Sequence, residues 1–131
     1  GKAVGSVLRI NGLKAFNEYV VRRSSRLPVA LKICSDQNED SKKELTEFQA
    51  VAGSFDGRLS CVALDLFAFH ENYQIVSQLM MQENILKLEL PLFMFFKDGA
   101  LYRTDTVPVA ILQGFHTREN LEQFITKKFF N

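Results

Sequence analysis

The chain has 131 residues, of which 47% are apolar and 24% are charged. This composition is typical of one globular domain and excludes a disordered chain, which carries fewer apolar residues and more unbalanced charge. Because 16 Lys and Arg residues face 15 Asp and Glu residues, the formal net charge is +1, which argues against a nucleic-acid or membrane-surface role driven by charge. We therefore expect one domain over residues 1–131, without nucleic acid as its partner.

No apolar run reaches the roughly 18 residues that span a bilayer, so the sequence predicts no membrane span. No targeting segment is visible either, and the sequence predicts no particular compartment.

The first half of the chain alternates apolar strands with amphipathic helices. Val7–Ile10 predicts a first strand, and the helical spacing of apolar residues over Leu13–Val20 predicts the helix that follows. Val29–Cys34 is almost entirely apolar, which is typical of a buried parallel strand. Ser41 and Glu44 then form the capping-box pattern, which predicts that a second helix is capped by Ser41.

The second half adds two strands, a helix and a hairpin. Leu59–Leu66 predicts a third strand, and Tyr73–Met80 has the spacing of a third helix. Leu92–Phe96 predicts a strand that turns at Asp98–Gly99 and returns as Ala100–Thr104.

The end of the chain is less regular, because the pattern over residues 105–113 is ambiguous and predicts no particular element. Thr117 is placed to cap a last helix. The resulting order is βαβαβαββα. Strands separated by helices pair in parallel with right-handed crossovers, and the hairpin adds antiparallel strands. The sequence thus predicts an α/β fold with a mixed central sheet and helices on both faces.

Three segments resemble the thioredoxin family. Pro28–Ile33 is similar to the strand that leads into the family's redox motif, and Phe55–Asp65 is similar to its passage from helix to strand. Leu90–Gly99 resembles the family's cis-proline loop, the strand after it and its turn. The resemblance implies a thioredoxin-like fold with a cis Leu90–Pro91 peptide bond.

The redox motif itself is where the chain departs from the family. A gapless alignment puts the two redox cysteines on Asn38 and Ser41, with Glu39 and Asp40 between them, and the preceding tryptophan on Gln37. Neither a carboxamide nor a serine hydroxyl attacks a disulfide. The resemblance therefore implies a divergent member without dithiol oxidoreductase activity, and we assign no catalytic residue.

The resemblance to redox-inactive members of this family implies that the chain acts in non-covalent protein binding or scaffolding, with a protein as its partner. In thioredoxins the cis-proline loop presents backbone groups to an extended peptide, which favours a binding groove here. The candidate residues are Gln37, Asn38, Glu39, Asp40, Ser41, Leu90 and Pro91. Two other readings stay open: the cis bond is inherited scaffold, and the carboxylates only cap and complement the helix.

The alternative function is a monothiol redox or glutathione-linked protein that uses Cys34. This residue ends the strand just before the loop that stands in place of the redox motif. A buried structural thiol is the competing interpretation. Cys61 belongs to the opposite end of a neighbouring parallel strand, so we expect no disulfide between the two cysteines. Lys32 stands at the position of the family's buried acid, and we expect it either to pair with a carboxylate such as Asp65 or to extend its ammonium to solvent.

Nothing in the sequence predicts a metal or a cofactor. His70 and His116 are far apart and have no neighbouring cysteines, so no metal-ligand spacing is evident. The pair Phe129–Phe130 either docks on the body of the protein, continues into a further segment or binds a partner.

Overall fold

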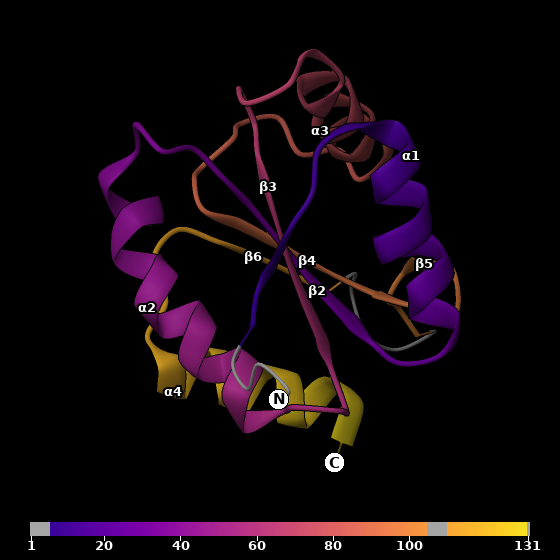
Figure 1. Cartoon of the computed structure of the whole chain (residues 1–131), viewed down its shortest axis with the longest axis vertical. Helices are drawn as coiled ribbons and strands as arrows, with labels where there is room; N and C mark the ends of the chain where they lie inside the picture. The colour runs from indigo at the N-terminus through magenta and orange to yellow at the C-terminus, as the bar shows by residue number, and fades with distance from the viewer. Residues whose placement is uncertain (1–5, 105–109, 131) are drawn as a thin grey trace.

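Six strands form one mixed sheet in the computed structural model, which describes residues 6–104 and 110–130. The strands are β1 (Leu8–Arg9), β2 (Val29–Cys34), β3 (Ser60–Asp65), β4 (Leu92–Lys97), β5 (Ala100–Leu101) and β6 (Ile111–Gln113). Their order is β1-β3-β2-β4-β5, and β6 also pairs with β4. The pairs β1–β3 and β2–β3 are parallel, whereas β4 is antiparallel to β2, β5 and β6. Figure 1 shows these strands crossing between the helices.

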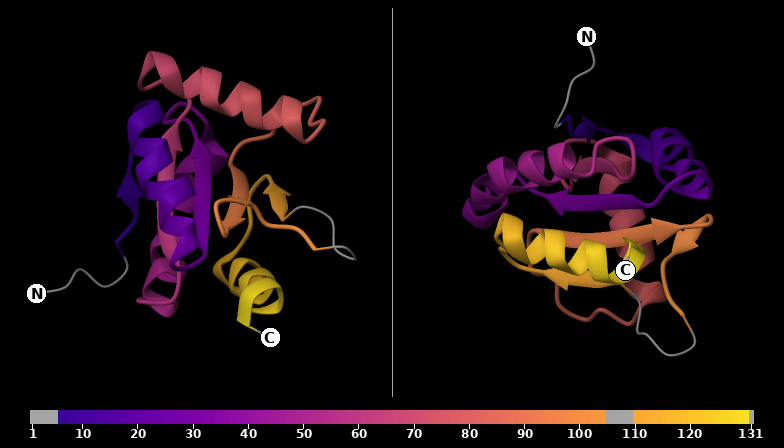
Figure 2. Two further views of the ribbon diagram at one scale, coloured as in Figure 1. Left: turned by 90° about the vertical axis from the view of Figure 1, so that its right-hand side faces the viewer. Right: turned by 90° about the horizontal axis from the view of Figure 1, so that it is seen from below.

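Helices cover both faces of the sheet, as predicted. They are α1 (Gly12–Phe16, continued by helical turns over Asn17–Arg22 and Arg23–Ser25), α2 (Glu39–Ser54), α3 (His70–Gln82) and α4 (Arg118–Ile125, continued over Thr126–Phe130). α1 and α3 lie on one face, and α2 and α4 lie on the other (Figure 1). In Figure 2 the yellow α4 runs beside the orange strands.

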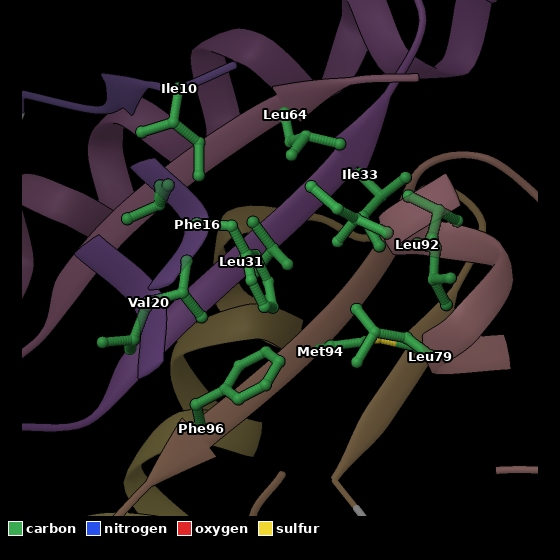
Figure 3. Packing of buried hydrophobic residues seen from close by; sticks show 14 of the residues in the cluster. Ile10, Phe16, Val20, Leu31, Ile33, Leu64, Leu79, Leu92, Met94 and Phe96 are labelled. Carbon is green, nitrogen blue, oxygen red and sulfur yellow. The ribbon is translucent and has the colours of Figure 1, made fainter. Parts of the chain in front are cut away.

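The two-residue period of the strands divides the core into two layers. On the α1 and α3 face, Phe16 and Val20 meet Leu31 from β2 and Met94 from β4 (Figure 3). The phenylalanines that alternate with these β4 residues point to the other face, where Phe93 packs edge-on against a ring of α2. Both faces of the central strands are therefore buried, which explains why their sequences are mostly apolar.

The last two aromatic residues of the described chain dock on the body of the protein, which was one of the three readings of this pair. Phe130 stacks on Phe55 with ring centroids 5.5 Å apart, and Phe129 lies 4.7 Å from the ring of Tyr102. The C-terminal turn is thus part of the second core layer.

The start of α2 differs from the prediction. Asn38, not Ser41, is the N-cap residue, and its side-chain oxygen accepts a hydrogen bond from the Ser41 backbone N–H at 2.8 Å. Ser41 and Glu44 are both buried inside the helix. The capping-box prediction was wrong because Asn38 has the same cap chemistry and comes earlier in the chain.

The strand at the β4 edge is split, and this explains why residues 105–113 could not be interpreted from the sequence. Tyr102 N–H donates to Phe95 O at 2.8 Å, and Phe95 N–H donates to Ala110 O at 3.2 Å. β5 and β6 thus continue one another along β4, joined by the Ala110 N–H bond to Tyr102 O at 3.0 Å. Between them lie residues 105–109, which are outside the described part of the chain.

The edge strands β1 and β5 are shorter than the predicted Val7–Ile10 and Ala100–Thr104. Edge strands are often very short in proteins, which limits the unpaired backbone that they present to other chains. The turn at Asp98–Gly99 forms as predicted, with positive φ at both residues.

Asn72 joins α3 to the start of α1 and to the end of β3. Its side chain is fully buried, and its Oδ1 accepts from Gly12 N–H at 2.8 Å. Its Nδ2 donates to Asp65 O at 2.8 Å and to Asn11 Oδ1 at 3.0 Å. Asn72 therefore satisfies the first free N–H of α1, for which the N-cap Asn11 provides no side-chain bond.

We expect Asn72→Ala to lower the free energy of unfolding by about 2–4 kcal/mol, because it leaves buried donors and acceptors without partners. Urea denaturation measures this difference. Gln74→Ala is the matched control, since Gln74 is exposed on the same helix, and its effect should stay below about 0.5 kcal/mol. Equal effects of the two substitutions would contradict the structural role of Asn72.

Candidate functional site

The sheet brings the predicted site residues to one edge. β2 and β3 run parallel and end there at Cys34 and Asp65. β4 runs the other way and begins at Leu92, which pairs with Ile33, so Leu90–Pro91 lies beside the end of β2. The Leu90–Pro91 peptide bond is cis, as the resemblance implied.

The cis-proline loop is held by the strand on its other side. Gly114 N–H donates to Pro91 O at 2.9 Å, and Glu89 N–H donates to the Gln113 side chain at 3.0 Å. These contacts fix the loop next to the end of β6. Sequence reasoning missed them, because it did not identify β6.

The loop before α2 is fixed by the same residues that were predicted as its binding face. Ser41 Oγ accepts from Ser35 N–H at 3.3 Å. Ser41 and Pro91 are buried, so they support the surface from below. The side chains that a partner can reach are those of Gln37, Glu39 and Asp40, with half-buried Asn38 and Leu90 beside them.

Asp65 connects this loop to the loop that follows β3. Its Oδ2 accepts from Asp36 N–H at 3.1 Å, and its Oδ1 accepts from Phe67 N–H at 2.9 Å. Phe67 is 68% exposed, and its ring stacks against the exposed ring of Tyr73 with centroids 6.5 Å apart. An exposed aromatic pair therefore belongs to the same edge of the sheet as the predicted binding residues.

The sequence held a signal for this aromatic pair. Asp65 ends a strand parallel to β2, and the carboxyl ends of neighbouring parallel strands meet at one edge. The residues that follow Asp65 could therefore have been expected near the loop before α2.

We name the whole set the candidate surface: Gln37, Asn38, Glu39, Asp40, Ser41, Phe67, Tyr73, Leu90 and Pro91.

Both cysteines are free and buried, and the predicted absence of a disulfide between them is confirmed. Cys34 pairs with Asp65 in the sheet, whereas Cys61 pairs with Ala30, so the thiols lie toward opposite ends of the strands. Cys34 is 4% exposed, and its Sγ contacts Leu64 O at 3.7 Å. Burial raises the pKa of Cys34 and raises the pKa of Cys61 to about 12.

Lys32 follows neither expectation from the sequence. It does not pair with Asp65, because that carboxylate is used by the backbone of the two loops. It also does not reach solvent, since it is 2% exposed and its Nζ donates to Ser41 O at 2.9 Å. Burial lowers the pKa of Lys32, while the nearby Cys34 and Glu44 act to raise it.

Glu44 is the second buried charge beneath the candidate surface. Its Oε2 accepts from His116 N–H at 2.7 Å, and its Oε1 has no hydrogen-bond partner among the described residues. Burial raises the pKa of Glu44 to about 7, although the bond from His116 and the charge of Lys32 act to lower it. Protonated and ionised Glu44 side chains therefore coexist near neutral pH.

Residues 6–104 and 110–130 contain no group of three His, Cys, Asp or Glu side chains that could hold a metal ion. In the same residues no helix combines the length and apolar character needed to cross a membrane.

Known proteins resemble this chain in structure. The thioredoxin of Malassezia sympodialis has a TM-score of 0.68 and 18% identity, over 95% of this chain and 91% of that one. Chloroplastic thioredoxin z has a TM-score of 0.68 and 17% identity, over 92% of each chain. A mutant thioredoxin of Halobacterium salinarum has a TM-score of 0.72 and 14% identity, over 100% of this chain and 98% of that one.

The chain has a thioredoxin-like fold. At these identities the likeness shows the fold alone. No family model and no curated protein matches the sequence.

We expect the unfolding free energy to fall as the pH rises from about 4.5 to about 7, because of Glu44. The folded chain holds this proton more tightly than the unfolded chain, so the stabilisation is complete below 4.5 and is lost above 7. Glu44→Gln should remove this part of the pH dependence, which amounts to at most about 3.5 kcal/mol at about 1.4 kcal/mol per pKa unit.

Urea denaturation from pH 4 to pH 8 measures this difference. Glu39→Gln is the control, since Glu39 is exposed in the first turn of the same helix. Identical pH profiles for the wild type and Glu44→Gln would contradict the assignment.

Proposed function

We propose that this chain is a thioredoxin-like domain without dithiol redox chemistry, which binds extended segments of partner proteins non-covalently at the candidate surface. The observation that carries the proposal is the hydrogen bond from Ser41 N–H to Asn38 Oδ1 at 2.8 Å. The resemblance puts the two redox cysteines at Asn38 and Ser41. In this chain Asn38 is the N-cap of α2, and Ser41 provides the backbone N–H that it caps.

The shape and chemistry of the candidate surface support protein binding. A loop edge with fixed backbone and exposed side chains can pair with an extended chain, and exposed rings provide apolar contacts to its side chains. Phe67 and Tyr73 are large exposed rings held at this edge through Asp65. Aromatic side chains of this kind are frequent energetic centres of protein interfaces.

A comparison adds support. The crystal structure of chloroplastic thioredoxin z, a protein of this fold, defines a novel type-specific target recognition. We infer that the candidate surface has a corresponding task here, with its own residues.

The thiol chemistry favours binding over the monothiol alternative. A reactive cysteine needs an accessible thiolate. Cys34 is 4% exposed, and burial raises its pKa, so little thiolate is present at neutral pH.

The binding proposal predicts that peptides selected from a random library on the wild-type protein depend on the candidate surface. We expect Phe67→Ala and Gln37→Arg each to weaken these peptides at least about tenfold, because both side chains are exposed at the contact. Fluorescence anisotropy measures the affinities. Gln123→Arg, on the α4 helix away from the candidate surface, is the matched control and should bind as the wild type does.

Peptides that bind all three variants equally would place the interaction elsewhere and overturn the proposal. A selection that yields no binding peptide would do the same.

The redox part of the proposal predicts no insulin reduction by the wild type above the rate with dithiothreitol alone. The double variant Asn38→Cys, Ser41→Cys should gain activity, because the helix N-terminus stabilises a thiolate at its cap. Wild-type activity that disappears in Cys34→Ser would support the monothiol alternative and refute the proposal.

A further inference from the structure

A small cavity lies between β1, β2 and the first turns of α2, beneath the loop before this helix. Its volume is about 80 Å³, and its lining includes Arg9, Lys32, Cys34, Ser35, Ser41 and Lys42. Three of these side chains are cationic, and Asp36 adds one carboxylate to the lining. The volume is enough for several water molecules or for one tetrahedral oxyanion.

Lys32 lines this cavity with a poorly compensated positive charge. Its ammonium has three donors, and the structure gives it one acceptor, Ser41 O at 2.9 Å. In the described part of the chain Lys32 forms no ion pair with a carboxylate. A buried ammonium in this state is costly unless a counter-charge reaches it.

The nearby acidic groups supply this counter-charge only in part. Glu44 directs Oε2 to His116 N–H and not to Lys32, and burial raises its pKa to about 7, so it is not fully ionised at neutral pH. The Asp36 side chain is 74% exposed, and its Oδ1 lies 3.6 Å from Nη2 of Arg9, with which it forms an ion pair. Cys34 keeps its proton because burial raises its pKa.

The other side chains around the cavity are suited to an anion. Arg9 and Lys42 have exposed side chains, so they can turn toward a ligand at the cavity mouth. Ser35 Oγ accepts from Gln37 N–H, and Ser41 Oγ accepts from Ser35 N–H. Among the described residues neither hydroxyl donates a hydrogen bond, so both protons are available to a ligand.

We propose that this cavity binds a small oxyanion of the phosphate class, with Lys32 as its buried counter-charge and with Arg9 and Lys42 at its mouth. Charge-assisted hydrogen bonds from ammonium and guanidinium groups to an oxyanion are among the strongest in proteins. This site does not depend on the protein-binding proposal, because its ligand sits under α2 and not on the exposed rings.

The test is an NMR titration of the full chain at pH 7 with sodium phosphate, at an ionic strength held constant with sodium chloride. We expect saturable shifts of the Ser35, Ser41 and Lys42 amides. Lys32→Met should weaken binding at least about tenfold, which corresponds to the loss of one hydrogen bond to a charged group. Lys43→Met is the matched control, because Lys43 is exposed on the same helix, does not line the cavity and changes the charge equally.

Two further measurements keep the test decisive. If Lys32→Met does not fold, Arg9→Gln and Lys42→Gln at the exposed mouth should each weaken binding about two- to fivefold. Phosphate should also slow the alkylation of Cys34 by iodoacetamide, since this thiol lines the same cavity.

Sulfate and acetate titrations identify the ligand class. Saturation by phosphate and sulfate supports the proposal, and saturation by acetate alone overturns it in favour of a carboxylate site. Shifts that stay linear with concentration, or that are the same in the wild type and in Lys32→Met, show only a general salt effect and also overturn it.

Discussion

The burial of Lys32 is the constraint on which the arrangement around α2 depends. Every residue of β2 is buried, because strands and helices cover it on all sides, and one of these residues carries an ammonium. The acceptor for this ammonium is the Ser41 carbonyl in the first turns of α2. The helix must begin early enough to place this carbonyl over the strand, and the cap at Asn38 sets that start.

Glu44 is also buried near Lys32, but the described residues show no ion pair between the two. Both groups are desolvated, so each needs hydrogen-bond partners of its own. Glu44 accepts from the backbone before α4, and its pKa rises. A lysine bonded to a helix carbonyl and a glutamate bonded to a backbone N–H thus lie under the candidate surface in place of one ion pair.

Most of the fold could be predicted from the sequence, because the pattern of apolar residues decides burial on both faces of a sheet. β2 was predicted to the residue, and the hairpin turn followed from Asp98–Gly99. The exceptions have polar causes. Asn38 and Ser41 offer equivalent cap chemistry to the same helix, and spacing does not rank them. β6 is short, and the residues before it gave no periodic pattern.

Of the candidate site, Leu90–Pro91 could be identified from the sequence, because its resemblance to a family loop is specific. The link through Asp65 could not be, since a carboxylate at the end of a strand binds backbone N–H groups that only the folded chain brings near. Of the two expectations for Lys32, pairing with Asp65 fails because the sequence does not show that those oxygens are already occupied, and reaching solvent fails because the side chain is buried.

The start of α2 also bears on redox chemistry. The N-terminus of a helix concentrates positive potential, which in a redox protein lowers the pKa of a thiol. Here Asn38 uses this site as a cap, and Glu39 and Asp40 place carboxylates in the first turn. Favourable interaction of these carboxylates with the helix dipole stabilises the fold by roughly 0.3–1 kcal/mol each. In this chain the positive potential at the start of α2 therefore stabilises the carboxylates of Glu39 and Asp40 and not a thiolate. This edge of the sheet presents an acidic helix turn together with the exposed rings of Phe67 and Tyr73.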